Sequence, residues 1–364
     1  MSQPVSRVYR YVRVYTALKE QILGNQYPEG TLLPSEHMIG EIYEVDRTTV
    51  RKALQLLVDD GLIEKQAGKG SVVLGSAAPQ NKPFALLEGS IAFVLPKSHH
   101  NGDRITQPFY ASLFYTIEQQ CSENNYSLVY LTLNSEDDFE RIIQTSNYAG
   151  IVFVSNVMPE IMDAAIQKNI PCVLVNNYYK NIVSVGADNF DGTYKATRLL
   201  IEQGHRNIGV VKGIADYQST IDRMNGCVVA LQEEGLTLRK ENILQAEWDY
   251  ESGSNAVAKM LNSGQKLPTA LLAFNDHLAL GAIHAISEHG LSTPGDISVV
   301  GVDNIEQSQY VSPPLTTVNI NPSLIGKVAT SNLFAQIKGA ETHPVKILTP
   351  VSLVVRDSVA TLSV

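Results

Sequence analysis

The sequence has little of what marks an exported, disulfide-linked or membrane-embedded protein. Only three cysteines occur in 364 residues, and Cys121, Cys172 and Cys227 lie far apart. An odd, scattered set of this kind predicts neither a disulfide framework nor a metal site. No apolar run reaches the roughly 18 residues of a membrane span, and residues 1–26 lack the apolar core of a signal peptide. We therefore expect a cytoplasmic protein with buried, reduced thiols and no membrane partner.

The sequence also lacks an excess of positive charge. Its formal net charge is −9, from 28 Lys or Arg against 37 Asp or Glu. Residues 1–75 contain nine of each kind, so the acidic surplus belongs to the remaining residues. Within this first part the cations concentrate at a few positions, namely Arg47, Arg51, Lys52, Lys65 and Lys69. Such a local footprint permits nucleic-acid binding through a small surface.

Signatures of catalysis are missing as well. The sequence shows no nucleophile–base pair, no metal-ligand spacing and no glycine-rich loop of the kind that cradles phosphates. The hydrophobic fraction of 44% and the mean hydropathy of −0.04 indicate a globular protein with enough apolar residues for two or three domains. We expect no enzymatic activity, no cofactor and no metal.

Residues 45–57 carry the clearest local pattern. Val50, Ala53, Leu54 and Leu57 recur at i, i+3, i+4 and i+7, which predicts a helix with one buried face. Asp46 is placed to cap its start. The opposite face carries polar and cationic side chains, namely Arg47, Thr48, Arg51, Lys52 and Gln55. Such side chains suit the major groove of DNA, although a merely solvated face has the same composition.

The flanking residues favour the DNA interpretation. Tyr15, Leu18, Ile22 and Leu23 give a first helix one apolar face that stops at Gly24. Ser35 can cap a second helix, for which we expect three residues to point inward, namely Met38, Ile39 and Ile42. Only residues 43–44 separate it from the next helix, a helix-turn-helix spacing. Residues 61–66 and 70–74 predict two short strands joined by a cationic tip, so the whole forms a winged helix.

Five blocks of this region, in this order, resemble the GntR family of bacterial transcription factors. They are Pro28-Glu29-Gly30, Leu33-Pro34-Ser35-Glu36, Arg47-Thr48-Thr49-Val50-Arg51-Lys52-Ala53-Leu54, Gly61-Leu62-Ile63 and Gly68-Lys69-Gly70. The resemblance covers nearly all of residues 1–75 and implies binding to double-stranded DNA. It implies that Ser35, Glu36 and His37 lie near the phosphate backbone or the groove edge. It also implies that Arg47, Thr48, Thr49 and Arg51 contact bases or phosphates, and that Gln66, Gly68 and Lys69 contact DNA from the wing, with Gly68-Lys69 in the minor groove.

Residues 76–89 are small, polar and proline-bearing, as in a linker. From residue 90 to 364 strand and helix patterns alternate. Strands are predicted at 90–95, 127–133, 150–154, 172–175, 208–211, 270–274 and 297–302, and helices at 109–124 and 137–146. This alternation predicts an α/β region with parallel sheets covered by helices on both faces. Because its length exceeds that of one ordinary sheet, we expect two doubly wound subdomains.

Polar and aromatic residues follow several of these predicted strands. Asn176-Asn177, Asn275-Asp276 and Asp303-Asn304 each come directly after a strand, and Phe109-Tyr110 lie just beyond the first. Ligands of parallel sheets bind beyond the carboxyl ends of the strands. Carboxylates, amides and aromatic rings there suit a polyhydroxylated ligand, although Asn and Asp also serve as helix caps and turn residues.

This second region resembles the LacI/GalR regulators, which are related to periplasmic sugar-binding proteins. The resemblance rests on residues 188–192, 204–205, 223–226, 275–281, 294–303 and 313–318. It implies a type I periplasmic-binding-protein-like fold that binds an effector and dimerises. The effector contacts that it implies are Phe109, Tyr110, Asn176, Tyr217, Ser219, Arg223, Trp248, Asn275 and Asp303.

Within this set we expect Arg223 and Asp303 to meet around the effector, with a purely structural ion pair as the alternative. A core position is the alternative for Trp248, and Gly204-His205 is expected to pack structurally. A GntR-type head on a LacI-type body resembles the arabinose repressors of Gram-positive bacteria. We therefore expect a homodimeric regulator that binds an inverted-repeat operator and represses carbohydrate-utilisation genes under control of a sugar effector. An activating sugar sensor and a GntR-headed enzyme are the alternatives.

Overall fold

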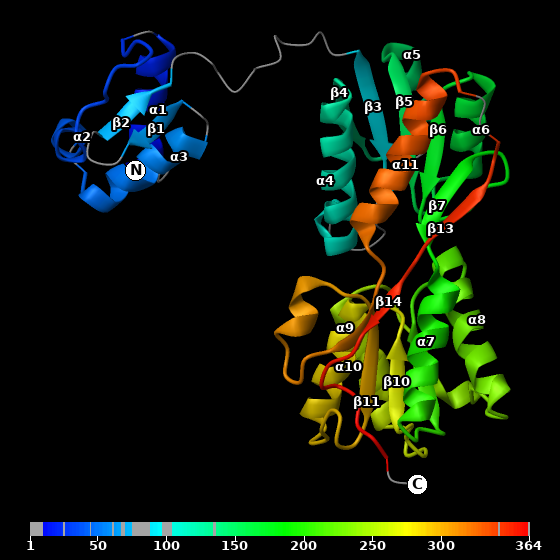
Figure 1. Cartoon of the computed structure of the whole chain (residues 1–364). Coiled ribbons are helices and arrows are strands. Elements are labelled where there is room, and N and C mark those ends of the chain that lie inside the picture. The colour runs from blue at the N-terminus through cyan, green and yellow to red at the C-terminus, as the bar shows by residue number, and fades with distance from the viewer. Residues whose placement is uncertain are drawn as a thin grey trace, which may run out of the picture. The chain divides into compact units, whose positions relative to one another are not determined.

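The computed structural model describes residues 10–24, 26–43, 45–59, 62–66, 70–74, 88–96, 104–133, 136–340 and 343–362. The chain forms two compact units, residues 1–86 and 87–364, each of which is described by itself (Figure 1). The two residues named for the tip of the wing, Gly68 and Lys69, lie outside the described residues.

The first unit packs three helices against a two-stranded hairpin. The helices are α1 (Arg10–Leu23), α2 (Glu36–Tyr43) and α3 (Arg47–Asp59), and the antiparallel strands are β1 (Ile63–Gln66) and β2 (Gly70–Val73). Both predicted caps are present: Ser35 Oγ accepts from the backbone N–H of Met38 at 3.3 Å, and Asp46 Oδ1 from that of Thr49 at 2.9 Å. The predicted apolar face of α3 is buried, from Val50 to Leu57.

One prediction for the first unit is wrong. Of the three apolar residues of α2 that were expected inside, only Ile39 is buried, whereas Met38 is 52% and Ile42 is 61% exposed. A helix of eight residues has little more than two turns, and here a single side chain reaches the core shared by α1 and α3. Met38 and Ile42, one turn apart, lie on its outer side.

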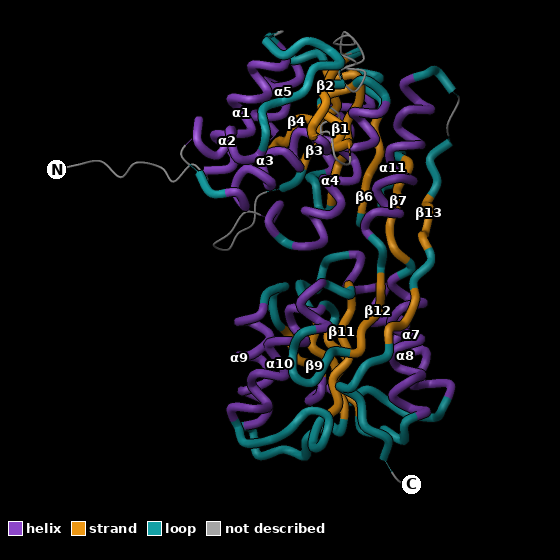
Figure 2. The backbone as a smooth tube through the Cα atoms, turned by 60° about the vertical axis from the view of Figure 1, so that its left-hand side comes forward, coloured by secondary structure: helices purple, strands orange, loops and turns teal. Residues whose placement is uncertain are grey.

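The second unit contains two six-stranded sheets, each in its own lobe (Figures 1 and 2). The first sheet has the order β4-β3-β5-β6-β7-β13, with bounds Tyr126–Leu131, Gly89–Val94, Tyr148–Val154, Cys172–Val175, Val183–Ala187 and Lys346–Thr349. The second has the order β9-β8-β10-β11-β12-β14, with bounds Ile243–Gln245, Ile208–Lys212, Ala270–Ala273, Ser298–Asp303, Thr316–Asn319 and Ser352–Val354. All neighbouring strands are parallel except β12 and β14. The predicted pair of parallel-sheet subdomains is confirmed.

Helices cover both faces of each sheet. In the first lobe α4 (Pro108–Glu123) and α11 (Pro322–Ile337) cover one face, and α5 (Glu136–Thr145) and α6 (Pro159–Gln167) the other. In the second lobe α7 (Asn189–Glu202) and α8 (Gln218–Glu233) lie opposite α9 (Tyr250–Leu261) and α10 (Asp276–Glu288). Side chains of β3 alternate between the two faces because successive residues of a strand point to opposite sides.

The chain passes between the lobes three times, after β7, after β12 and after β13. As a result α11, drawn in orange in Figure 1, packs beside α4 in the first lobe although β12, the strand before it in sequence, belongs to the second. One apolar core cluster contains residues of both lobes, so the lobes share a continuous core at this side. The three cysteines are buried and unpaired. In the described part of the chain no helix has both the length and the apolar character needed to cross a bilayer.

Candidate functional site

The outer face of α3 presents its polar side chains to solvent. Arg47, Thr48, Arg51, Lys52 and Gln55 are all exposed, as the helical pattern predicts. The side chains of Arg47 and Arg51 are 71% and 58% accessible, so both guanidinium groups can reach a partner outside the unit. Their removal opens no cavity in the core.

Glu36 holds these two arginines together. Its carboxylate accepts from Arg47 Nε at 2.8 Å and from Arg51 Nε at 3.0 Å. The pKa of Glu36 is lowered, chiefly by the hydrogen bond from Arg47. Exposed ion pairs of this kind contribute about 0–1 kcal/mol, which a phosphate or a base edge can replace. Glu36 therefore orients the two side chains without locking them.

Other residues predicted for the DNA interface gather at the start of α2. A pocket of about 590 Å³ is lined by four of them, Ser35, Glu36, His37 and Arg47, together with Gly40, Glu41 and Val45. His37 lies 3.5 Å from Glu41, one turn on in α2. The structure thus brings Ser35, Glu36 and His37 together with Arg47, the first residue of α3, at one concave surface.

The remaining predicted DNA residues differ in their surroundings. Thr49 donates its hydroxyl to Asp46 Oδ2 at 2.8 Å, so this hydroxyl supports the helix cap. That contact and the backbone hydrogen bond from Thr49 lower the pKa of Asp46, with the backbone bond as the larger cause. Gln66 is exposed at the end of β1, where its amide lies 3.5 Å from Glu64. Contacts of all these residues with DNA stay a prediction.

In the second unit, the central observation is the buried guanidinium of Arg223 on α8. Its Nε donates to Asn189 Oδ1 at 2.7 Å, its Nη1 donates to the carbonyl of Phe274, and its Nη2 lies 3.5 Å from Asp303 Oδ1. Arg223 thus ties together the start of α7 and the ends of β10 and β11. Arg223 and Asp303 meet as the ion pair that the sequence analysis gave as the alternative, and their contact with an effector stays a prediction.

The carboxylates of this region are strongly influenced by burial. Burial raises the pKa of Asp303 to about 6, and the Arg223 charge offsets only part of that rise. Burial and the nearby Asp303 raise the pKa of Asp276 to about 8. Asp276 accepts from the backbone N–H of Ile305 at 2.8 Å and from the Thr317 hydroxyl at 2.5 Å. It therefore fixes the turn that follows Asp303.

Aromatic side chains lie beside this ion pair. The Trp248 ring lies 5.9 Å from the Arg223 guanidinium, and 6.0 Å separates the centroids of Trp248 and Tyr217. Asn275 caps α10 through Leu278, and its amide donates to the Trp248 carbonyl at 2.9 Å. Asn275 thus serves as a helix cap, which was the alternative for Asn and Asp at strand ends. Its contact with an effector stays a prediction.

The first lobe contributes Tyr110 and Arg104 to the same place. The Tyr110 hydroxyl lies 2.9 Å from Ser155 Oγ, and Phe109 packs edge-on against its ring at 5.1 Å. Burial raises the pKa of Tyr110, whereas the charge of Arg104 lowers it and that of Asp303, in the other lobe, raises it. The residues from both lobes therefore face one another.

Two residues predicted to contact the effector, Asn176 and Ser219, are less closely connected to the cluster around Arg223. Asn176 follows β6 with a positive φ of 59°, and its backbone N–H donates to Val185. Ser219 is buried in the first turn of α8.

His205 is structural, as expected, since its ring nitrogens contact Thr269 Oγ1 at 2.9 Å and the Ala360 carbonyl at 3.1 Å.

Sequence reasoning missed several residues of this cluster. Asn189 lies within residues 188–192, which carry the resemblance, and Asp276 follows a predicted strand, but neither was predicted as a site residue. The contacts that each makes with buried neighbours explain its role. Arg104 lies in a short 3₁₀ turn, Arg104–Thr106, in a stretch without apolar periodicity. No pattern in the sequence points to it.

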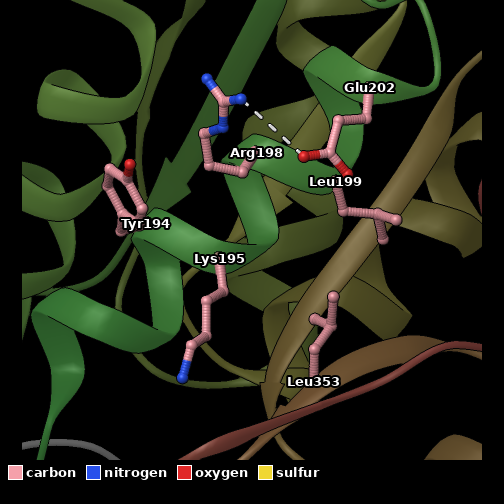
Figure 3. Close-up of a pocket in the computed structure, with 6 residues that line it drawn as sticks. All are labelled: Tyr194, Lys195, Arg198, Leu199, Glu202 and Leu353. Carbon is pink, nitrogen blue, oxygen red and sulfur yellow. Dashed lines mark ion pairs between the residues drawn. The ribbon is translucent and has the colours of Figure 1, made fainter. Parts of the chain in front are cut away.

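A second pocket, of about 400 Å³, lies on the outer side of the second lobe (Figure 3). Its lining comes from α7 and β14. The cations there are already paired: Lys195 lies 2.5 Å from Asp191, and Arg198 contacts Glu234 and lies 3.9 Å from Glu202. This surface offers an effector fewer unpaired groups than the cluster between the lobes.

Comparisons with known proteins agree with this architecture. Residues 10–73 match the gntR family of bacterial regulatory proteins, and residues 197–359 match the periplasmic binding protein-like domain. The HTH-type transcriptional repressor PurR of Actinobacillus pleuropneumoniae serotype 3 is 33% identical over 268 residues, which are 70% of this chain and 79% of PurR. The PurR of Aliivibrio salmonicida is 35% identical over 64% of this chain and 72% of its own.

A crystal structure of a LacI transcriptional regulator from Bacillus cereus subsp. cytotoxis NVH 391-98 superposes with a TM-score of 0.69 and 29% identity. It covers 76% of this chain and 99% of that one. The chain belongs to the LacI family of transcription regulators. Its DNA-binding head is of the gntR type. This LacI-family regulator is therefore not an enzyme; it binds operator DNA and responds to a small-molecule effector.

Proposed function

We propose that this LacI-family regulator is a cytoplasmic repressor of carbohydrate-utilisation genes, whose DNA binding is controlled by a sugar or sugar derivative. The observation that carries the proposal is the cluster where Tyr110 of one lobe faces Tyr217, Arg223, Trp248 and Asp303 of the other. Aromatic rings suit the C–H faces of a sugar, and a carboxylate accepts from its hydroxyls.

The mechanism that we propose is a population shift. An effector that contacts both lobes stabilises one arrangement of the lobes over another, by no more than its difference in affinity for the two. The chain crosses between the lobes three times, so a change in the arrangement of the lobes affects the whole second unit. The proposed result is a changed affinity of the gntR-type heads for DNA.

The test uses operator DNA obtained from a random-sequence selection with the full chain. Fluorescence anisotropy then follows the complex while neutral sugars, sugar acids and sugar phosphates are added one at a time. We expect at least one of them to raise the melting temperature of the chain and to release the operator. A hundredfold excess over Kd stabilises by about 2.7 kcal/mol, which a thermal-shift assay resolves. Stronger operator binding with the ligand would support the activating alternative.

We further propose that the chain is a homodimer on an inverted-repeat operator. Two heads related by a two-fold axis read matching half-sites, and one small head offers few contacts. Sedimentation of the full chain at micromolar concentration is expected to give a dimer, and the selected DNA should contain an inverted repeat. A monomer that binds a single half-site with full affinity would contradict this proposal.

A further inference from the structure

Arg104, in the first lobe, reaches across to the second. It is 9% exposed and lies in the 3₁₀ turn that precedes α4. Its Nη2 donates to the hydroxyl of Tyr217, and its guanidinium lies 5.7 Å from the centre of the Tyr217 ring. Tyr217 is the cap residue of α8, the helix that carries Arg223. Arg104 is therefore part of the cluster proposed above to bind the effector.

The charges of this cluster do not balance. Arg223 is paired with Asp303, whereas Arg104 has no carboxylate within ion-pairing distance in the part of the chain that the structure describes. Asp276 adds little negative charge at neutral pH because its pKa is raised to about 8. A buried guanidinium without a counter-ion is unfavourable, and one hydroxyl and one ring face offset only part of that cost.

Two side chains of the cluster also have N–H donors without an acceptor among the described residues. A guanidinium has five N–H donors, and among the described residues Arg104 uses one of them, for Tyr217, which leaves four. Trp248 Nε1 is buried and has no hydrogen-bond partner among the described residues. A ligand with acceptor oxygens would satisfy both side chains, and an anionic ligand would also neutralise Arg104.

We propose that the effector carries an anionic group, a carboxylate or a phosphate, which binds the Arg104 guanidinium. This rests on the proposed effector function and narrows it to sugar acids and sugar phosphates. The forked donors of arginine match two oxygens of such a group. Trp248 Nε1 donates to a further acceptor of the same ligand.

The test compares wild type, Arg104→Gln and the control Arg198→Gln, which removes an arginine from the outer surface of α7. Thermal-shift and calorimetric titrations use inorganic phosphate against chloride at equal ionic strength. They then use two matched series: glucose, gluconate and glucose 6-phosphate, and ribose, ribonate and ribose 5-phosphate. We expect the anionic members to bind wild type and Arg198→Gln at least tenfold more tightly than their neutral parents. Arg104→Gln should lose that preference.

The acid and the phosphate of each series show which anion is preferred. Arg104→Lys, which keeps the charge but not the fork, should retain a weaker preference for anions. The proposal is overturned if anions bind Arg104→Gln as tightly as wild type, or if none of them binds wild type. It is also overturned if wild type binds the neutral sugars more tightly than their acids and phosphates, which measurements on wild type alone can show.

The two proposals fail separately. Neutral sugars that release the operator from wild type would remove the anionic effector and leave the sugar-controlled regulator in place. Anions that bind through Arg104 but leave operator affinity unchanged would remove effector control and keep the anion site.

Discussion

Arg47→Ala and Arg51→Ala are each expected to lower strongly the preference of the chain for operator over random DNA. Both guanidinium groups lie exposed on α3 and are oriented together by Glu36. A lost bidentate contact to a base costs about 1–3 kcal/mol, which corresponds to about 5- to 150-fold in relative affinity. Competition titrations with selected operator and random DNA at physiological salt measure this ratio.

The control for this experiment is Arg198→Ala, which removes one positive charge from the other unit. Its operator preference should equal that of wild type. The fold of the head should survive both test substitutions because neither side chain contributes to the core around Val50 and Leu57. If both variants discriminate as wild type does, α3 does not read the operator. If they bind all DNA equally less well, the arginines contact phosphates and not bases.

Local patterns predicted the head well because its structure depends on neighbours in sequence. The i, i+3, i+4 spacing of α3 and the cap at Asp46 are decided within one or two turns. The exposure of Met38 and Ile42 is not decided by neighbours in sequence. The apolar residues of a short helix are buried only if another element covers them. Strands β7, β9, β12, β13 and β14 were not predicted. Of these, β13 and β14 are short, partly exposed strands, each at an edge of its sheet.

The cluster proposed to bind the effector was predictable only in part, for a similar reason. Strand ends and the family resemblance pointed to Arg223, Trp248 and Asp303. Arg104 and Asn189 act through partners more than thirty residues away in sequence. A carbonyl oxygen, such as that of Phe274, has no sequence signature at all. The Arg104 contact depends on how the two lobes meet, and the contacts of Asn189 and Phe274 depend on packing within the second lobe. No periodicity in the sequence encodes either.

Arg223→Ala is expected to destabilise the effector-free second unit by about 3–5 kcal/mol at pH 8, because it leaves Asp303 buried without its cation. The side chains of Arg223 and Asp303 are only 6% and 16% exposed, so water replaces little of the lost interaction. Arg223 also holds Asn189 and the Phe274 carbonyl, which lose their donor. Calorimetry of the full chain measures the loss as a lower melting temperature of the second unit.

The pH dependence identifies the cause. The pKa of Asp303 in the folded protein, about 6, lies above its ordinary value of 3.8. A raised pKa means that its protonated form is favoured by folding, so this contribution to stability is present at low pH and is lost as the pH rises through 6. Without Arg223 the pKa of Asp303 rises further. The substitution should therefore cost least at pH 5, where Asp303 carries a proton, and most at pH 8.

The double variant Arg223→Ala with Asp303→Asn should be more stable at pH 8 than Arg223→Ala alone, because no charge is left unpaired. The exposed pair of Arg198 and Glu234 provides the comparison, since water screens it and its loss should lower the stability far less. Both Arg223 variants should also lose the response to effector, because neither keeps the pair of Arg223 and Asp303 in the proposed site. An Arg223→Ala chain as stable as wild type at pH 8 would show that the ion pair contributes nothing to the fold.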